Sequence, residues 1–395
     1  MMIRYLAIIL LLPLFLLAGE SKMAVRGYLK SLFFTEKYPR ESDWLADNLL
    51  HGRLDLQYYA GQNLTGVIAL RFRQYAGESV RKDYITNNQI STQQDLLNLD
   101  WLVYERASII GYSEIDRLWL DWTATKFQIS IGRQRIAWGT NLVWNPTDLF
   151  NPASVLDFDY EEQPAVDAVR LQYYTGPLAK LEFALKPDRD ADQTVAAGLY
   201  RFNIRNYDFN LLAGIRNFRW MAGISWAGDI NKAGFRGEMT VSRNRRATKS
   251  SDFALKWFGI YPIDFYEKPE LTAALSIDYT FRNSFYAHTE LLCNSNGINR
   301  NAGLLLLQAR ELGLPTLARW SIFQEFAYDL TPLTRLSWFG IFNPNDKSIV
   351  ILPSITYSLA TNLDLLLLGL ISDGEPLTEF GAYYDAVVLC IKWSF

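Results

Sequence analysis

The chain repeats a pattern in which apolar residues alternate with charged ones. In residues 52–59, Leu54, Leu56 and Tyr58 oppose Arg53, Asp55 and Gln57. Alternation with period two predicts a β-strand with two different faces. A charged face on nearly every strand is too polar for the core of a soluble β-sandwich. It is typical of a barrel whose outside contacts lipid and whose inside is wet.

Such segments recur in pairs joined by tight turns from residue 25 to the C-terminus. Counting them predicts an all-β, antiparallel transmembrane barrel of about 18 strands with long external loops, and the weak signal of single strands also allows 16 or 20. Long connections are expected at residues 35–50, 76–116, 139–165, 243–270, 295–318 and 372–384. Residues 96–105 also look like a strand. Counting them would exchange the long and short connections, so we place them in the second external loop as a strand extension above the membrane.

The two ends of the chain carry targeting signals. Residues 1–19 combine a basic start, an apolar run and a small-residue cleavage site, which predicts a cleaved signal peptide followed by one barrel domain over residues 20–395. Glu20 stands where a lipoprotein would need cysteine. Trp393 and Phe395 end a period-two strand, which is typical of the assembly signal of outer-membrane barrels. We therefore expect a cell outer-membrane protein in contact with lipid, lipopolysaccharide and the barrel-assembly machinery.

Residues 126–164 join a strand to a long loop. The loop contains Asn145-Pro146 and Asn151-Pro152, and proline cannot sit inside a central strand. It is too apolar for a loop that lies wholly in water. We expect it to fold into the barrel mouth and narrow the pore, although packing on neighbouring loops above the rim would also bury it. The predicted constriction residues are Trp144, Asp148, Phe150 and Asp157.

Two stretches resemble a known family. GRQRIAWG at residues 132–139, followed by NPTDLFNP, is similar to a motif of porin-like outer-membrane barrels related to alginate-export and capsule-assembly barrels, many without an assigned function. Residues 328–395 also resemble them, including the turn at residues 343–348 before a strand with Pro353-Ser354. The resemblance implies a transport or export barrel and names no substrate.

The period-two pattern also predicts which charged residues face the lumen. Opposed charges across a pore set ion preference, and the same charges can simply pair and brace the wall. The predicted pore-lining residues are Arg71, Arg73, Asp121, Arg170, Glu182, Arg216, Arg236, Glu238, Asp278, His288 and Glu290.

Two arginines leave the orientation of the strand before them open. Arg133 and Arg135 continue the apolar face of Ile129 and Ile131. Either a bulge turns them inward as pore residues, or they sit at the outer rim and meet lipopolysaccharide phosphates.

Several kinds of chemistry find little support in the sequence. His51 and His288 lack a recognisable serine or acid signature, so a lumen-lining role is favoured over catalysis. The acidic run Asp157, Asp159, Glu161 and Glu162 lacks the spacing of a calcium loop. Cys293 and Cys390 match no metal or disulfide pattern. We expect no catalytic residue, metal or cofactor, and the formal net charge of −3 gives no basic field for nucleic acid.

Three functions remain open. The leading one is a porin-like channel for passive transport of small solutes. The second is a barrel for export or surface assembly of polysaccharide or lipid, and the weakest is an outer-membrane enzyme. The solute is not identifiable from the sequence, and a homo-oligomer stays open.

Overall fold

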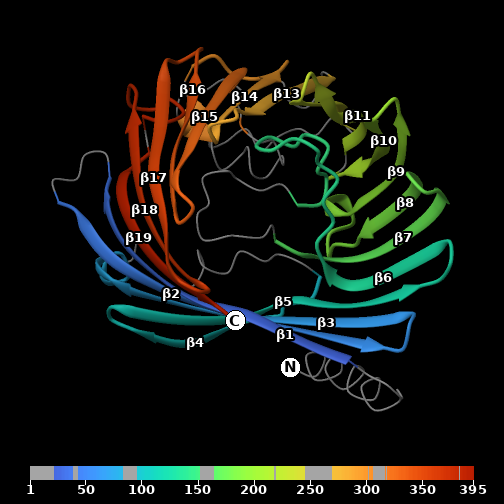
Figure 1. Ribbon diagram of the computed structural model, residues 1–395, viewed down its shortest axis with the longest axis horizontal. Coiled ribbons are helices and arrows are strands. Elements are labelled where there is room, and N and C mark those ends of the chain that lie inside the picture. The colour runs from blue at the N-terminus through green and yellow to red at the C-terminus, as the bar shows by residue number, and fades with distance from the viewer. Residues whose placement is uncertain are drawn as a thin grey trace.

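The computed structural model describes residues 22–38, 43–82, 96–151, 164–217, 219–244, 269–300, 302–305, 316, 318–381 and 383–395. Viewed along the barrel, the strands form a closed ring (Figure 1). The expected signal peptide, residues 1–19, lies outside the described residues. Within them, no helix is long and apolar enough to cross a bilayer. Short helices are α2 (Glu78–Arg81), η2 (Ala191–Gln193) and η3 (Ala302–Leu305).

The described chain contains 19 antiparallel strands. Their bounds are β1 (Lys22–Lys37), β2 (Leu45–Ala60), β3 (Leu64–Gly77), β4 (Asp100–Arg106), β5 (Ile109–Thr123), β6 (Phe127–Gln134), β7 (Val166–Gly176), β8 (Ala179–Lys186), β9 (Val195–Ile204), β10 (Tyr207–Arg216), β11 (Arg219–Ile230), β12 (Ala233–Asn244), β13 (Glu270–Thr280), β14 (Phe285–Asn294), β15 (Trp320–Thr331), β16 (Thr334–Asn343), β17 (Ser348–Ala360), β18 (Leu363–Asp373) and β19 (Asp385–Ser394).

Eighteen of these strands make the ring, as the sequence predicted. Consecutive ring strands pair with each other, β3 pairs with β5, and β19 closes onto β1 from Tyr28↔Ser394 to Lys37↔Asp385. β4 pairs with residues 109–114 of β5, while β6 pairs with residues 118–123. The extra segment therefore extends the wall beyond the end of β6 and adds no strand to the ring.

The two faces of the wall differ in polarity. In β13, Leu275 and Ile277 are exposed on the outside, whereas Thr272 and Ser276 are buried on the inside. The same alternation holds in β6, where Ile131 is exposed and Ser130 is buried. An apolar outside and a polar inside are what a barrel in lipid requires.

Two connections are shorter than expected. β1 continues to Lys37 and β2 begins at Leu45, so most of the predicted loop at residues 35–50 is strand. β5 begins at Ile109, eight residues before the predicted start at Arg117. The sequence pattern missed these ends because a strand that rises above the bilayer keeps its hydrogen bonds without needing an apolar face.

The C-terminal residue completes the ring beside a glycine. Phe395 N–H donates to the Gly27 carbonyl at 2.9 Å, and Gly27 N–H donates to the Phe395 carbonyl at 3.0 Å. A Cβ on Gly27 would lie 2.6 Å from the Phe395 ring and 2.4 Å from the Arg53 carbonyl oxygen. Only glycine leaves room here for the ring and for the backbone of β2.

We expect Gly27→Ala to weaken ring closure by about 1–3 kcal/mol, because the added methyl overpacks this contact. Heat-modifiable electrophoretic migration and urea unfolding in detergent would measure the loss. Gly52→Ala is the matched control, since its Cβ would meet only Leu29 Cδ1 at 3.6 Å. Equal stability of the two variants would contradict this account of closure.

The assignment of faces gives a second prediction. Ile129 lies on the outward face of β6, so Ile129→Arg should cost roughly 2–4 kcal/mol near mid-membrane. The neighbouring Gln128 faces inward and donates to Asp121 at 2.9 Å, so Gln128→Arg should cost little. Unfolding in lipid vesicles measures both changes. Similar losses at the two positions would show that the faces are assigned wrongly.

Candidate functional site

The segment after β6 leaves the wall and runs inside the ring (Figure 1). β6 ends at Gln134, whose side chain donates to the carbonyls of Ser130 and Ala168 and ends the ladder. Residues 135–151 have no helix or strand. We call them the inner loop. Its buried N–H groups need acceptors. Inward carboxylates of β12 and β14 accept from backbone N–H groups of the loop, and a carboxylate of β8 accepts from the indole N–H of Trp138.

Glu238 on β12 holds the middle of the inner loop. Its carboxylate accepts hydrogen bonds from the backbone N–H of Asn141 at 2.9 Å, from that of Thr147 at 2.9 Å and from the Thr147 hydroxyl at 2.7 Å. Thr140 also donates through its N–H and hydroxyl. One carboxylate therefore ties together two parts of the loop that are six residues apart.

Glu290 on β14 holds the next part of the inner loop. It accepts from the N–H of Trp144 at 2.6 Å and from that of Val143 at 3.2 Å. The Trp144 ring packs edge-on against Phe323 of β15 with 6.3 Å between ring centroids. The loop thus reaches from β6 across the inside of the ring to β14 and β15.

Glu182 on β8 anchors the start of the inner loop. It accepts from the indole N–H of Trp138 at 2.6 Å and pairs with Arg170 at 2.7 Å and Lys180 at 2.9 Å. Glu182 is 1% exposed, and the two cations lie directly against its carboxylate. Its charge is therefore neutralised within the wall.

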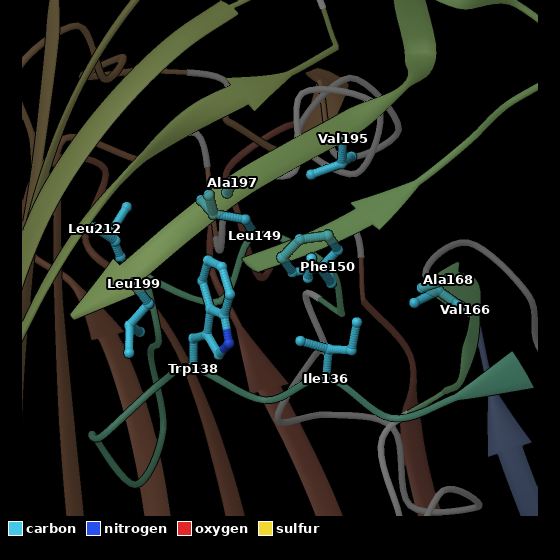
Figure 2. Close-up of a cluster of buried hydrophobic side chains, with 11 residues drawn as sticks. Ile136, Trp138, Leu149, Phe150, Val166, Ala168, Val195, Ala197, Leu199 and Leu212 are labelled. Atoms are coloured by element: carbon cyan, nitrogen blue, oxygen red, sulfur yellow. The ribbon is translucent and has the colours of Figure 1, made fainter. Parts of the chain in front are cut away.

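Apolar packing supports the same end of the inner loop (Figure 2). Ile136, Trp138, Leu149 and Phe150 pack against inward side chains of β7 to β10, and Trp138 meets the Phe150 ring edge-on at 5.0 Å between centroids. The wall residues of this cluster are Val166, Ala168, Ala184, Val195, Ala197, Leu199 and Leu212. The apolar residues that made this loop unusual in the sequence are those that bind it to the wall.

Asp148 differs from the three wall glutamates. Its side chain is 2% exposed, and neither carboxylate oxygen has a hydrogen-bond partner among the described residues. Burial raises the pKa of Asp148 to about 7, with Glu238 adding to the increase and Arg216 and Arg135 opposing it. The Asn151 N–H also lowers this pKa, although it lacks the geometry of a full hydrogen bond.

The opposite side of the ring carries a network of ion pairs. β2 and β3 lie across the lumen from β13 and β14 (Figure 1). Arg71 on β3 pairs with Glu114 at 2.9 Å, and Arg53 on β2 pairs with Asp116 at 2.5 Å. Further members are Asp55, Arg73, Arg117 and His51. Glu114 and Asp116 escaped the sequence analysis because the start of β5 was placed too late.

Two lysines lie on the neighbouring strands β1 and β19 of the same side of the ring, which we call the basic side. Lys30 on β1 and Lys392 on β19 are directly opposite each other in register, and their ammonium groups lie 5.7 and 5.0 Å from the centre of the Tyr28 ring. A cation over an aromatic face is stabilised by the ring quadrupole. In the sequence, the spacing of two between Tyr28 and Lys30 could have predicted that these side chains share one face of the first strand.

All the predicted pore-lining residues fall on the inward face of their strands. Most are buried in pairs or loop contacts. Asp121 accepts from Gln128 and Ser130, and Arg236 pairs with Asp278. Of the predicted constriction residues, Trp144, Asp148 and Phe150 belong to the inner loop, and Asp157 lies outside the described residues, as do the other members of its acidic run. Trp393 and Phe395 are half-exposed on the outside.

Arg133 follows neither predicted alternative in full. It faces outward, yet its guanidinium is buried in an ion pair with Asp167 at 2.9 Å. Leu97 covers this pair: its N–H donates to Asp167 at 2.7 Å and its carbonyl accepts from Arg133. The guanidinium is thereby shielded from a lipopolysaccharide phosphate, and it fastens the segment that leads into β4. Arg135 is exposed.

A serine, a histidine and a glutamate do meet on neighbouring strands. Ser276 Oγ lies 2.9 Å from His288 Nε2, and His288 Nδ1 lies 3.6 Å from Glu325. Ser276 is fully buried, and Glu290 also lies 3.5 Å from His288 Nε2. A nucleophile must be reachable by its substrate, and the burial of Ser276 does not meet this requirement. No group of three metal-ligating side chains occurs within the described part of the chain.

No family model and no curated protein matches the sequence. The structure, however, is similar to solved barrels over nearly its whole length. Acinetobacter baumannii OccAB1 has a TM-score of 0.58 at 8% identity, covering 96% of this chain and 97% of that one. Pseudomonas aeruginosa OccD3 (OpdP) has a TM-score of 0.55 at 8% identity, with 94% and 91% covered.

Pseudomonas aeruginosa OpdK, solved with vanillate, has a TM-score of 0.54 at 11% identity, with 96% and 99% covered. This chain shares the barrel fold of these proteins. The narrower resemblance to alginate-export and capsule-assembly barrels finds no support among these structural neighbours.

We expect Glu238→Ala to release the middle of the inner loop, because three backbone N–H groups lose a charged acceptor worth about 1.5–3 kcal/mol for each bond. Amide hydrogen exchange of residues 140–147 should become at least about tenfold faster, since even one such bond exceeds 1.4 kcal/mol. Thr240→Ala, on the same face of β12, is the control. Unchanged exchange in the Glu238 variant would show that this carboxylate does not hold the loop.

Proposed function

We propose that the protein is an outer-membrane channel for the passive passage of small solutes. The observation that carries this proposal is a closed 18-strand ring with a loop anchored to its inner face by wall carboxylates. The inner loop narrows the lumen, and Trp144, Asp148 and Phe150 lie in it. Solutes that pass beside the loop would meet the ion-pair network on β2, β3 and β5.

The wall chemistry fits a sieve better than a polymer exporter. Glu182, Glu238 and Glu290 bind the loop at three places, so the loop resists being pushed aside. A polysaccharide chain needs a continuous open path, which an anchored loop obstructs. The export or surface-assembly function suggested by the family resemblance is therefore our second proposal, and an enzyme is disfavoured by the burial of Ser276.

The surroundings of the barrel follow from the same proposal. Lipid and lipopolysaccharide would contact the apolar outer face, and Trp393 and Phe395 would serve as the signal for the barrel-assembly machinery. Vanillate, present in the OpdK structure, is an apt first probe because an aromatic carboxylate could meet both the cations and the Tyr28 ring on the basic side.

Planar-bilayer recording tests the channel directly. The purified protein should give steady conductance steps, and vanillate should reduce the current if it enters the pore.

Deleting residues 145–151 should raise single-channel conductance and admit larger sugars in liposome swelling, because it removes part of the inner loop. Heat-modifiable migration must first show that the variant is assembled.

Absence of conductance from correctly folded protein would overturn the channel proposal. Conductance that stays unchanged after the deletion would leave a channel in place and remove the inner loop from its constriction.

A further inference from the structure

We propose that Asp148 makes the inner loop proton-sensitive: the loop is held firmly while the Asp148 carboxyl carries a proton and loosens when it ionises. The pH of the surrounding medium would then set how far the loop narrows the lumen. The part of this inference that concerns solute passage rests on the proposed channel function, whereas the loosening of the loop does not.

The hydrogen bonds of the loop explain why this one carboxyl lacks donors. The adjacent Thr147 directs both its N–H and its hydroxyl to Glu238, and Thr140 and Asn141 direct their N–H groups there too. The Asp148 N–H donates to the Asn145 carbonyl at 3.0 Å. The N–H groups of residues 140, 141, 147 and 148 and the Thr147 hydroxyl are thus directed elsewhere, and a buried carboxylate without a full hydrogen bond is unfavourable.

The same stretch contains other buried polar atoms without a partner among the described residues. Both side-chain atoms of the Asn141 amide and the oxygen of Asn145 are in this condition, as are both oxygens of Asp148. Five of the eleven such atoms therefore lie within residues 141–148. Buried unpaired groups are unfavourable, so these atoms lower the free energy needed to release a loop that its three anchors otherwise hold.

The charges facing Asp148 come from three elements. Glu238 on β12 disfavours the ionised form, whereas Arg216 on β10 and Arg135 of the loop favour it. Burial outweighs both arginines, so the pKa of Asp148 rises to about 7. Ionisation of Asp148 would place a negative charge close to Glu238, the carboxylate that holds the middle of the loop.

The direction of the pH effect follows from linkage. In a released loop in water, Asp148 would titrate at its ordinary pKa of about 3.9. Between about pH 4 and pH 7 the held loop keeps the proton and the released loop does not, so raising the pH favours release. Over about three pH units the equilibrium can shift by as much as about a thousandfold, and it is flat below and above that window.

Hydrogen exchange and bilayer recording together test this inference. Exchange of residues 140–147, corrected for intrinsic rates, would be measured between pH 4.5 and 7.5 on the assembled barrel. We expect wild-type protection to fall at least about tenfold over this range, since the linkage allows up to about a thousandfold. Conductance or its fluctuations should rise in parallel. Asp148→Asn and Asp148→Leu should keep strong protection throughout, because neither residue ionises.

Asp329→Asn is the control, since Asp329 belongs to an exposed pair with Arg335, and it should show the wild-type pH dependence. Protection that does not change with pH in the wild type, or a wild-type pH dependence in both Asp148 variants, would overturn the inference. Protection that responds to pH in a protein without conductance would instead refute the channel function and keep the proton-sensitive loop.

Discussion

The structure depends on the rule that backbone N–H and C=O groups in lipid must be paired within the protein. An open sheet would leave two unpaired edges, so the wall closes by pairing β19 with β1. Phe395 contributes to this closure by exchanging backbone hydrogen bonds with Gly27. Closure also separates the two faces of each strand: within the bilayer the outside must be apolar, so polar side chains gather mainly inside.

The polar groups on the inner face then allow a loop to be buried inside the ring. A loop buried inside a protein must find acceptors for its backbone N–H groups. Glu238 and Glu290 on the inner face supply them, and Glu182 accepts from the Trp138 indole N–H. The cluster around Trp138 removes apolar surface from water. The sequence predicts that these glutamates line the pore. In the structure, they accept hydrogen bonds from the loop.

The two sides of the lumen consequently differ in what they offer a solute. On the loop side, carboxylates are bound to N–H groups, and Asp148 is the carboxyl left without donors among the described residues. On the other side, cations and acids are paired within one network, joined by Lys30 and Lys392 around the Tyr28 ring. The groups that hold the inner loop and the ion-pair network therefore lie on different parts of the wall.

The sequence alone determined the barrel, a strand number near 18, the two faces of each strand and the exceptional character of residues 126–164. These are properties of period-two alternation and turn residues, which act over a few neighbouring positions. Only the tertiary structure decided which charges meet. Glu238 binds the backbone of Asn141, which is 97 positions away in the sequence, and Leu97 covers Arg133. β5 begins at Ile109, before the alternating pattern that predicted it. Such pairings depend on strand register and loop path through three dimensions, and no local pattern encodes them.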